Sequence, residues 1–599
     1  MRPITLGAVL DLRLYRVTLL PFAVVLIVAA FSLHPRPAAL SSTVPQQTFD
    51  GSVAAAKMRT LADLYPDLTP GSAGDDALAS VLAHEGSPGG LAGGGFHVSV
   101  VSSNVETTVG ARTVRTVLAT RAGTGAGIAL IADRGGSPQG SAGALSGTAT
   151  LLELAAIYKN LSPAGFQRPL TLVSTAGGAS AMGAVAAALP AGTEAAIVIG
   201  DLADAGGHGP YVVPWSGSGG LAPIQLRRTV ASEIAAALGS SAGDVALADQ
   251  LARLALPLTT GAQGPLEAAG VPAVLVAARG ESEPAPSAPI ASAGRISAFG
   301  QGLLSATLAL GAAPGLASGP TRDLAIGTQV LSGWGVRAVV GLLLLSLLGC
   351  TLDVLARARR RRVAVGRSVG WVLSFAAPFV LAGLFAASLG AGGLLPATPA
   401  APVTAAELPV SGAGAAVLVS IGLLFILAWV LRASARARSR HKGPPESIGA
   451  GAALLVVGGV TATLLWFANP YTAALLILPL HLWLVVMTRE HDRPPLLGGL
   501  YLLLSLAPLI AAIALLCTGL GVEPLALVWT LVLLIAGGGL SVSGLLLASL
   551  TAGCFVAAAA ILLRPGTLGP GEQLEVTVRG PLSYAGPGSL GGTESALRR

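Results

Sequence analysis

Long uncharged apolar runs occupy two separate parts of the chain. The first run, residues 17–33, has about the length that a bilayer core requires, and three arginines precede it. It ends in His34-Pro35-Arg36-Pro37 without a small-x-small cleavage motif. We therefore interpret residues 1–34 as a cytoplasmic stub followed by a signal-anchor helix, with a cleavable signal peptide as the alternative.

A second series of apolar segments fills residues 334–563. Its first six members are each long enough to span a bilayer: 335–355, 369–392, 411–431, 448–468, 471–488 and 495–517. The remaining stretch, 524–563, would measure roughly 60 Å as one helix against a hydrocarbon core of about 30 Å. Two helices that turn near Gly537-Gly538-Gly539 fit better. The pattern predicts a bundle of seven or eight helices, which makes nine spans with the anchor, or eight if the last stretch crosses once.

Between these parts, residues 35–325 have a different pattern. No apolar run there reaches 18 residues, and short strand-like runs alternate with Ala-rich helical ones. Strands are predicted at 127–133, 170–175, 195–199 and 271–276, with helices at 146–158 and 182–189. The alternation predicts an α/β domain with a mostly parallel sheet flanked by helices, in addition to the all-α membrane bundle. A site is expected at the carboxyl ends of the strands.

Clustered arginines predict the orientation. Basic loops near residues 357–367, 432–442 and 489–493 alternate with loops that carry almost no charge, such as 393–410. The basic loops should be cytoplasmic, which puts 35–325 outside. We expect a multi-pass protein of the cell (plasma) membrane whose large domain is extracytoplasmic. The Gly/Pro-rich tail, 564–599, lies outside with nine spans and inside with eight.

Composition excludes a simple cytosolic enzyme. Of the 599 residues, 53% are hydrophobic and only 11% are charged, and the mean hydropathy is +0.73. The net charge of +7 comes from arginines beside apolar runs, since only three residues are lysines. This placement indicates membrane topology and not nucleic-acid binding. The Ala/Gly/Arg-rich, Lys-poor composition is typical of a high-GC bacterium.

Few residues are candidates for chemistry. The three cysteines, Cys350, Cys517 and Cys554, all lie in apolar runs, so a zinc site would need histidines and carboxylates. Asp133 and Asp201 follow predicted strands and could form a remnant cation or substrate-amine site, or could each cap a loop or helix. His208 is either a late metal ligand or a solvent-facing loop residue.

His481 is an ionisable candidate inside the membrane. It lies eight residues before Arg489, which places it roughly 12 Å from the helix end. Pro479 is two residues earlier. The alternatives are a polar pocket or a kinked interface between helices, and a neutral histidine hydrogen-bonded to a neighbouring helix.

The order of elements in 120–280 resembles the zinc-dependent aminopeptidase family. The resemblance depends on Ser146-Gly147, the LLELA run 151–155 and Gly270-Val271-Pro272-Ala273-Val274. In that family, two zinc ions are held by a His after the first strand, an Asp before the SG helix, a Glu-Glu pair after the second strand, an Asp after the third and a late His. One Glu of the pair is the general base that activates the metal-bound water.

This chain departs from the family's ligand set. The resemblance puts Asp133 at the His position, Ala142 near the bridging Asp and Gly177-Gly178 at the Glu-Glu pair; only Asp201 matches, and no histidine occurs between His208 and His441. The resemblance therefore implies a catalytically inactive copy with no metal and no other cofactor.

The overall architecture is similar to the peptidase-like membrane subunit of the GPI transamidase complex. This similarity implies a scaffold or a subunit that binds a membrane-protein partner or a peptide or protein substrate at the membrane. An alternative is a transporter or lipid-handling protein with an outer receptor domain; few intramembrane charges and no evident inverted repeat count against it. An active zinc aminopeptidase with relocated ligands is the third hypothesis.

Overall fold

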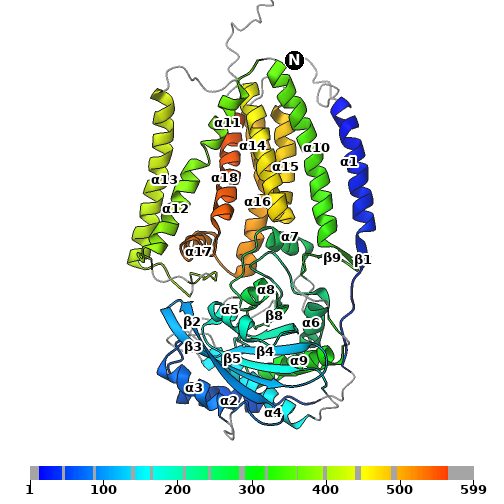
Figure 1. Ribbon diagram of the computed structural model, residues 1–599, viewed down its shortest axis with the longest axis vertical. Coiled ribbons are helices and arrows are strands. Elements are labelled where there is room, and N and C mark those ends of the chain that lie inside the picture. Colours follow the sequence, from blue (N-terminus) through cyan, green and yellow to red (C-terminus); the bar gives the residue numbers. More distant parts are fainter. Residues whose placement is uncertain are drawn as a thin grey trace, which may run out of the picture.

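The computed structural model describes most of the chain, with the α/β domain at one end and the helical bundle at the other (Figure 1). The described residues are 12–42, 47–84, 90–135, 142–161, 166–206, 211–240, 245–281, 290–313, 315–316, 321–360, 362–395, 399, 401–405, 407–438, 447–487 and 495–563.

The α/β domain is built on a seven-stranded sheet in the order β2-β3-β5-β4-β6-β8-β7. Its strands are β2 (His97–Thr107), β3 (Gly110–Arg121), β4 (Gly127–Asp133), β5 (Leu170–Thr175), β6 (Thr193–Ile199), β7 (Val212–Val213) and β8 (Ala273–Val276). The central strands β5, β4, β6 and β8 run parallel, whereas β2, β3 and β7 pair antiparallel. The predicted α/β class is confirmed, but the sheet is mixed and not mostly parallel.

Helices cover both faces of this sheet. They are α2 (Gly51–Leu64), α3 (Ala73–Ala83), α4 (Ser146–Asn160), α5 (Gly178–Ala188), α6 (Ile224–Leu238), α8 (Gln263–Ala268) and α9 (Ala293–Ala312). Helix α7 (Leu247–Ala255) lies between the domain and the bundle (Figure 1). Alternate strand residues face opposite sides. Ile128 and Leu130 of β4 belong to a core with α2, α3, α4, α6 and α9, while Ala129 and Ile131 face α5 and α8.

The second core does not stop at the domain boundary. It continues from Ile131 and Leu275 of the sheet through Leu254 of α7 to bundle residues such as Leu454 and Trp483. Since one apolar core joins both parts, the α/β domain is packed on the bundle and not merely tethered to it.

The bundle helices match the predicted apolar segments closely. They are α1 (Leu12–Phe31), α10 (Gly333–Arg360), α11 (Val365–Leu373), α12 (Ala377–Ala391), α13 (Gly412–Arg438), α14 (Ser447–Ala468), α15 (Pro470–Met487), α16 (Pro495–Leu520), α17 (Pro524–Ala536) and α18 (Val542–Leu562). Within the described part of the chain, six apolar stretches are long enough to cross a membrane, with α11 and α12 counted as one. The chain therefore has the architecture of a multi-pass membrane protein.

The stretch 524–563 divides at Gly537-Gly538-Gly539, as predicted, into α17 and α18. Helix α17 has 13 residues, about 20 Å at 1.5 Å per residue, which is shorter than a hydrocarbon core of about 30 Å. Figure 1 shows α17 lying across the bundle beside the α/β domain, whereas α18 runs along it. This geometry favours eight crossings over nine.

A small sheet joins the two membrane helices that border the domain. Strand β1 (Leu33–Pro35) follows α1, and β9 (Leu324–Ile326) and β10 (Gln329–Leu331) precede α10. All three pair antiparallel in the order β1-β10-β9. The chain therefore enters and leaves the domain at the same place.

The turn between α14 and α15 holds the C-terminal end of α7. Asn469 Nδ2 donates to the carbonyl of Leu254 (2.7 Å), and Thr472 Oγ1 donates to that of Ala255 (2.6 Å). The last carbonyls of a helix have no partner within the helix, so the bundle side chains complete the hydrogen bonding of α7. Nearby, Arg253 of α7 lies against Gly519 of α16.

This contact gives a testable prediction. A Cβ added at Gly519 would lie 2.7 Å from Arg253 Nη2, and this guanidinium is fixed by Glu281 at 2.8 Å. We expect Gly519→Ala to destabilise the folded protein by about 1–3 kcal/mol through overpacking. Gly499→Ala, in the same helix with no heavy atom within 4 Å, is the matched control and should be neutral or slightly stabilising. Thermal unfolding of both variants in detergent checks this; equal midpoints would contradict it.

Candidate functional site

The carboxyl ends of the parallel strands bring the predicted aspartates to one edge of the sheet. Asp133 is the last residue of β4, and Asp201 follows β6 by two residues. These strands are neighbours in which Ala132 pairs with Ile199. The geometry places both carboxylates where the sequence predicts a site, on adjacent strand ends.

Asp201 closes the turn after β6. Its Oδ1 accepts from the Ser146 hydroxyl (2.9 Å) and from the N–H of Ala203 (2.7 Å), while Ser146 Oγ accepts from the N–H of Leu202 (2.9 Å). The adjoining Gly147 is needed for this approach, because a Cβ there would lie 2.6 Å from the carbonyl oxygen of Ile199. The Ser-Gly pair thus attaches the start of α4 to the loop that carries Asp201.

Burial raises the pKa of Asp201 to about 6, against the two hydrogen bonds that lower it. Between its ordinary pKa of 3.8 and about 6, the folded chain binds more protons than the unfolded chain, so stability falls as pH rises through this window. We expect Asp201→Asn to stabilise the protein at pH 7.5 by up to about 2 kcal/mol, with the gain shrinking toward pH 4.

Thermal midpoints measured at several pH values test this prediction. Asp50 is a useful control because its pKa is lowered, mainly by the Ser52 hydroxyl, so Asp50→Asn should give no gain at pH 7.5. A pH-independent effect of Asp201→Asn would contradict the prediction.

Asp133 also closes a turn. Its Oδ1 accepts from the N–H of Gly135 (3.0 Å), and its carbonyl accepts from the Thr148 hydroxyl (3.1 Å). Both aspartates therefore have local structural roles, and a ligand-binding role for either stays a prediction.

Arg134, which sequence reasoning did not select, is the most buried charge at this edge. Its Nε donates to Asp75 Oδ1 at 2.9 Å, and both side chains are 0% exposed. Its other nitrogens donate to the carbonyls of Ser174 (2.7 Å) and Arg115 (2.5 Å). A charged residue directly after a buried strand is the signal that could have identified it.

The residues at this edge do not fit the two-zinc site of the resembled family. Gly177 and Gly178, which the resemblance puts at the Glu-Glu position, have no side chains to bind a metal, and a Cβ on Gly135 would lie 3.0 Å from the Gly177 nitrogen, so backbone fills this space. Among the residues that the structure describes, no three His, Cys, Asp or Glu side chains are grouped to hold a metal ion. His208 lies outside the described residues. Zinc coordination needs at least three such donors together.

Two further charge pairs lie after β6 and β8. Asp204 Oδ2 is 3.0 Å from Arg279 Nε; the aspartate side chain is 1% exposed, whereas that of Arg279 is 46% exposed. Glu281, two residues further, pairs with Arg253 of α7 at 2.8 Å. Burial raises the pKa of Glu281 and lowers that of Arg253, in opposition to their mutual attraction. At this edge, the guanidinium of Arg279 is therefore exposed, whereas the buried Glu281–Arg253 pair connects the edge to α7 beside the bundle.

His481 makes a hydrogen bond within its own helix. Its Nδ1 lies 2.8 Å from the carbonyl oxygen of Ile477, four residues earlier in α15. This contact is within one helix and is not the expected bond to a neighbouring helix. A functional role for His481 stays a prediction.

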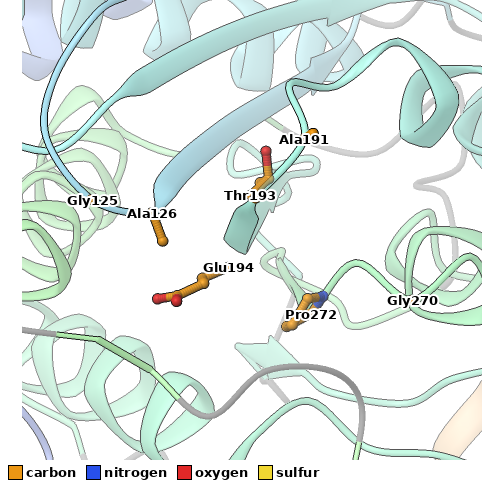
Figure 2. Close-up of a pocket in the computed structure, with 8 residues that line it drawn as sticks. Gly125, Ala126, Ala191, Thr193, Glu194, Gly270 and Pro272 are labelled. Atoms are coloured by element: carbon orange, nitrogen blue, oxygen red, sulfur yellow. The ribbon is translucent and has the colours of Figure 1, made fainter.

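A shallow pocket of about 320 Å³ lies at the opposite edge of the sheet (Figure 2). Its lining comes from the loops before β4, β6 and β8 and includes Gly125, Gly192 and Gly270. Its carboxylate, Glu194, accepts from Arg168 Nη2 (2.6 Å) and from the N–H of Leu316 (3.0 Å). These bonds give Glu194 a structural role, and the pocket is remote from the strand ends of the candidate site.

No protein-family model matches the chain, and no curated protein matches it. Among solved structures, it is similar to a glutaminyl cyclase from an Acidobacteriales bacterium, with 15% identity and a TM-score of 0.32 over 44% of this chain and 96% of that one. It is also similar to a zinc-dependent exopeptidase from Parabacteroides distasonis, with 13% identity and a TM-score of 0.32 over 44% of this chain and 99% of that one. A zinc aminopeptidase from Bacillus subtilis has 10% identity and a TM-score of 0.35 over 44% of this chain and 95% of that one.

Proposed function

We propose that this protein is a non-catalytic subunit of a membrane complex that binds a partner or a polypeptide substrate at the carboxyl edge of its α/β domain. One observation carries the proposal: this edge presents the Arg279–Asp204 pair, while glycines stand where the resembled family has its paired glutamates. An exposed guanidinium with a buried carboxylate behind it suits recognition of peptide carbonyls and carboxylates. The domain would then serve as a scaffold in the manner of the GPI transamidase subunit.

The apolar core shared by the two parts supports a role in which ligand binding to the α/β domain affects the membrane bundle. Glu281 follows the same strand as Arg279, and its partner Arg253 contacts α16 through Gly519. A ligand at the strand ends would therefore lie two residues from a buried connection to the bundle. The predicted extracytoplasmic placement makes the ligand one that is presented outside the membrane.

Site-specific photo-cross-linking in the native membrane tests this proposal. A photoreactive amino acid at the exposed position 206, beside an intact Arg279, should give a discrete polypeptide adduct, whereas one at the exposed position 191, at the opposite edge of the sheet, should give none. Arg279→Ala in the chain with the photoreactive group at position 206 should reduce the adduct. Equal labelling from both edges, or none from either, would contradict the proposal.

The alternative of a transporter or lipid-handling protein depends on His481. Its Nδ1 is bonded to the Ile477 carbonyl in the same helix, so a role in substrate movement would use the other ring nitrogen, Nε2. Normal assembly of His481→Ala with loss of substrate movement would favour the alternative, and unchanged behaviour would remove its main support.

A further inference from the structure

The two edges of the seven-stranded sheet differ sharply in length. One edge is β7, a strand of only two residues, and the other is β2, which has 11 residues. Among the residues that the structure describes, β2 pairs with β3 alone, and no backbone group of another segment bonds to its outer side. Figure 1 shows β2 at the margin of the domain. Its outer side therefore presents a row of backbone N–H and C=O groups without a strand partner.

Residues 98–105 of β2 lack the devices that usually protect an edge strand. Natural edges are blocked by lysines, prolines, bulges or very short strands. This stretch has no charged residue and no proline, and β2 pairs with β3 over its whole length without a register shift. Val100 and Val101 point to opposite faces of the sheet, yet they are 38% and 39% exposed. Such a strand is a template for the addition of a further strand.

The orientation of the sheet favours a second copy of this chain as the source of that strand. Ile128 of β4 faces the outer helices, whereas Ile131 faces the core that continues into the bundle. The sheet therefore lies across the line from the outer helices to the bundle, and the direction perpendicular to the sheet runs roughly along the bundle axis (Figure 1).

This direction satisfies the symmetry that a membrane dimer requires. Two chains that join their sheets through antiparallel edge strands are related by a two-fold axis perpendicular to the shared sheet. Here that axis is close to the membrane normal. Only such an axis keeps both copies in one membrane with the same topology.

We propose that the outer side of β2 pairs antiparallel with the same strand of a second copy of this chain, so that the two α/β domains share one continuous sheet. The absence of charge in residues 98–105 removes the repulsion that like charges on opposite strands would cause. Pairing about an axis in the exposed run 99–102 would bury valines of both copies and supply partners for the free backbone groups. This surface is separate from the carboxyl edge, because β2 lies at the side of the sheet and not at the ends of β4 and β6.

Cysteine cross-linking of the full chain in its native membrane tests this pairing. Single cysteines are placed at each position from 98 to 104, and the three native cysteines are buried in bundle helices. A two-fold axis brings a residue opposite its own copy at one position only. One residue from the axis, the two copies are already displaced by about 7 Å along the strands and by about 5 Å between them, which is beyond the Cα separation that a disulfide allows. We therefore expect a disulfide-linked species of two 59.2-kDa chains from a single position and little from its neighbours.

Val53→Cys is the matched control, because Val53 lies on α2 of the same domain and is 39% exposed, like Val101. It should give no linked species. No dimer from any position of β2, equal yields along the whole strand, or an equal yield from position 53 would overturn the proposal. A cross-link from β2 to a different protein would also overturn it, since the added strand would then come from another polypeptide.

A lysine beside the axis tests the same pairing through charge. Val101→Lys, or Val100→Lys if the axis lies at position 101, should slow the formation of this disulfide about two- to fivefold, the effect of an unfavourable cross-strand pair. Val53→Lys should leave the rate unchanged. Thermal midpoints equal to that of the unmodified chain verify that these exposed substitutions leave the fold intact. An unchanged rate in the folded β2 variant would overturn the proposal.

Discussion

Replacement of Arg134 by methionine is expected to lower the free energy of unfolding of the α/β domain by about 3–5 kcal/mol, the cost of breaking a buried ion pair. The guanidinium and its partner Asp75 are both 0% exposed. Without Arg134, the Asp75 carboxylate keeps the N–H of Gly71 (3.1 Å) but loses its cation, and the carbonyls of Ser174 and Arg115 lose the guanidinium as a donor. Hydrogen exchange of the β4 and β5 amides measures the loss as a fall in opening free energy.

An exposed ion pair of the same chain provides the control. Arg357 and Asp353 are 48% and 43% exposed, so Arg357→Met should cost less than about 1 kcal/mol. The double replacement Arg134→Met with Asp75→Leu should recover part of the loss, because it removes the uncompensated charge. A loss below about 1 kcal/mol for Arg134→Met alone would contradict the assignment of this pair as a structural link at the strand ends.

Replacement of Arg253 by methionine is expected to be nearly as costly, about 3–5 kcal/mol, with its effect concentrated where the domain meets the bundle. Arg253 and Glu281 are 4% and 1% exposed and lie 2.8 Å apart, and Arg253 Nη1 also donates to the carbonyl of Leu258 (2.7 Å). The variant leaves Glu281 buried without its cation, and the loss of that cation raises the pKa of Glu281 further. We therefore expect faster hydrogen exchange in α7 and in the neighbouring end of α16.

Arg168→Met is the matched control for this effect. Its pair with Glu194 lies at the amino ends of the strands, with side chains that are 6% and 25% exposed. Arg168→Met should increase the hydrogen-exchange rate of the β6 amides. The exchange rate of the α7 amides should rise no more than the loss of global stability explains. An equal increase of the α7 exchange rate in both variants would contradict a specific connection between the domain and the bundle through Arg253.

Much of the architecture could be predicted from the sequence because hydrophobic length is a strong signal. Strand β5 has the predicted bounds, 170–175, since a short apolar run between turn residues leaves few alternatives. The division of 524–563 at three consecutive glycines also follows from length alone. Such local signals also located Asp133 and Asp201 correctly at adjacent strand ends.

The rest depends on contacts between distant parts of the chain. The hairpin β2–β3 has Ser, Thr and Asn among its valines and no continuous apolar run, so its pattern does not stand out. Arg134 pairs with Asp75 across 59 residues, and Asn469 reaches Leu254 across 215. No periodicity encodes which charge finds which partner, so these links are visible only in the structure.

The continuous core makes the α/β domain dependent on the bundle. Sheet residues such as Leu275 share a core with Trp483 of α15, so an isolated fragment 35–325 would expose this apolar face. Measurements on the full chain avoid that problem.

The most direct test is the zinc content of the full chain, purified in detergent without chelators and dialysed against zinc, together with aminopeptidase activity. We expect substoichiometric zinc and no hydrolysis, because the resemblance puts Gly177 and Gly178 at the position of the paired glutamates and no cluster of metal donors occurs among the described residues. About one or two zinc ions per chain, with peptide hydrolysis that a chelator abolishes, would contradict it.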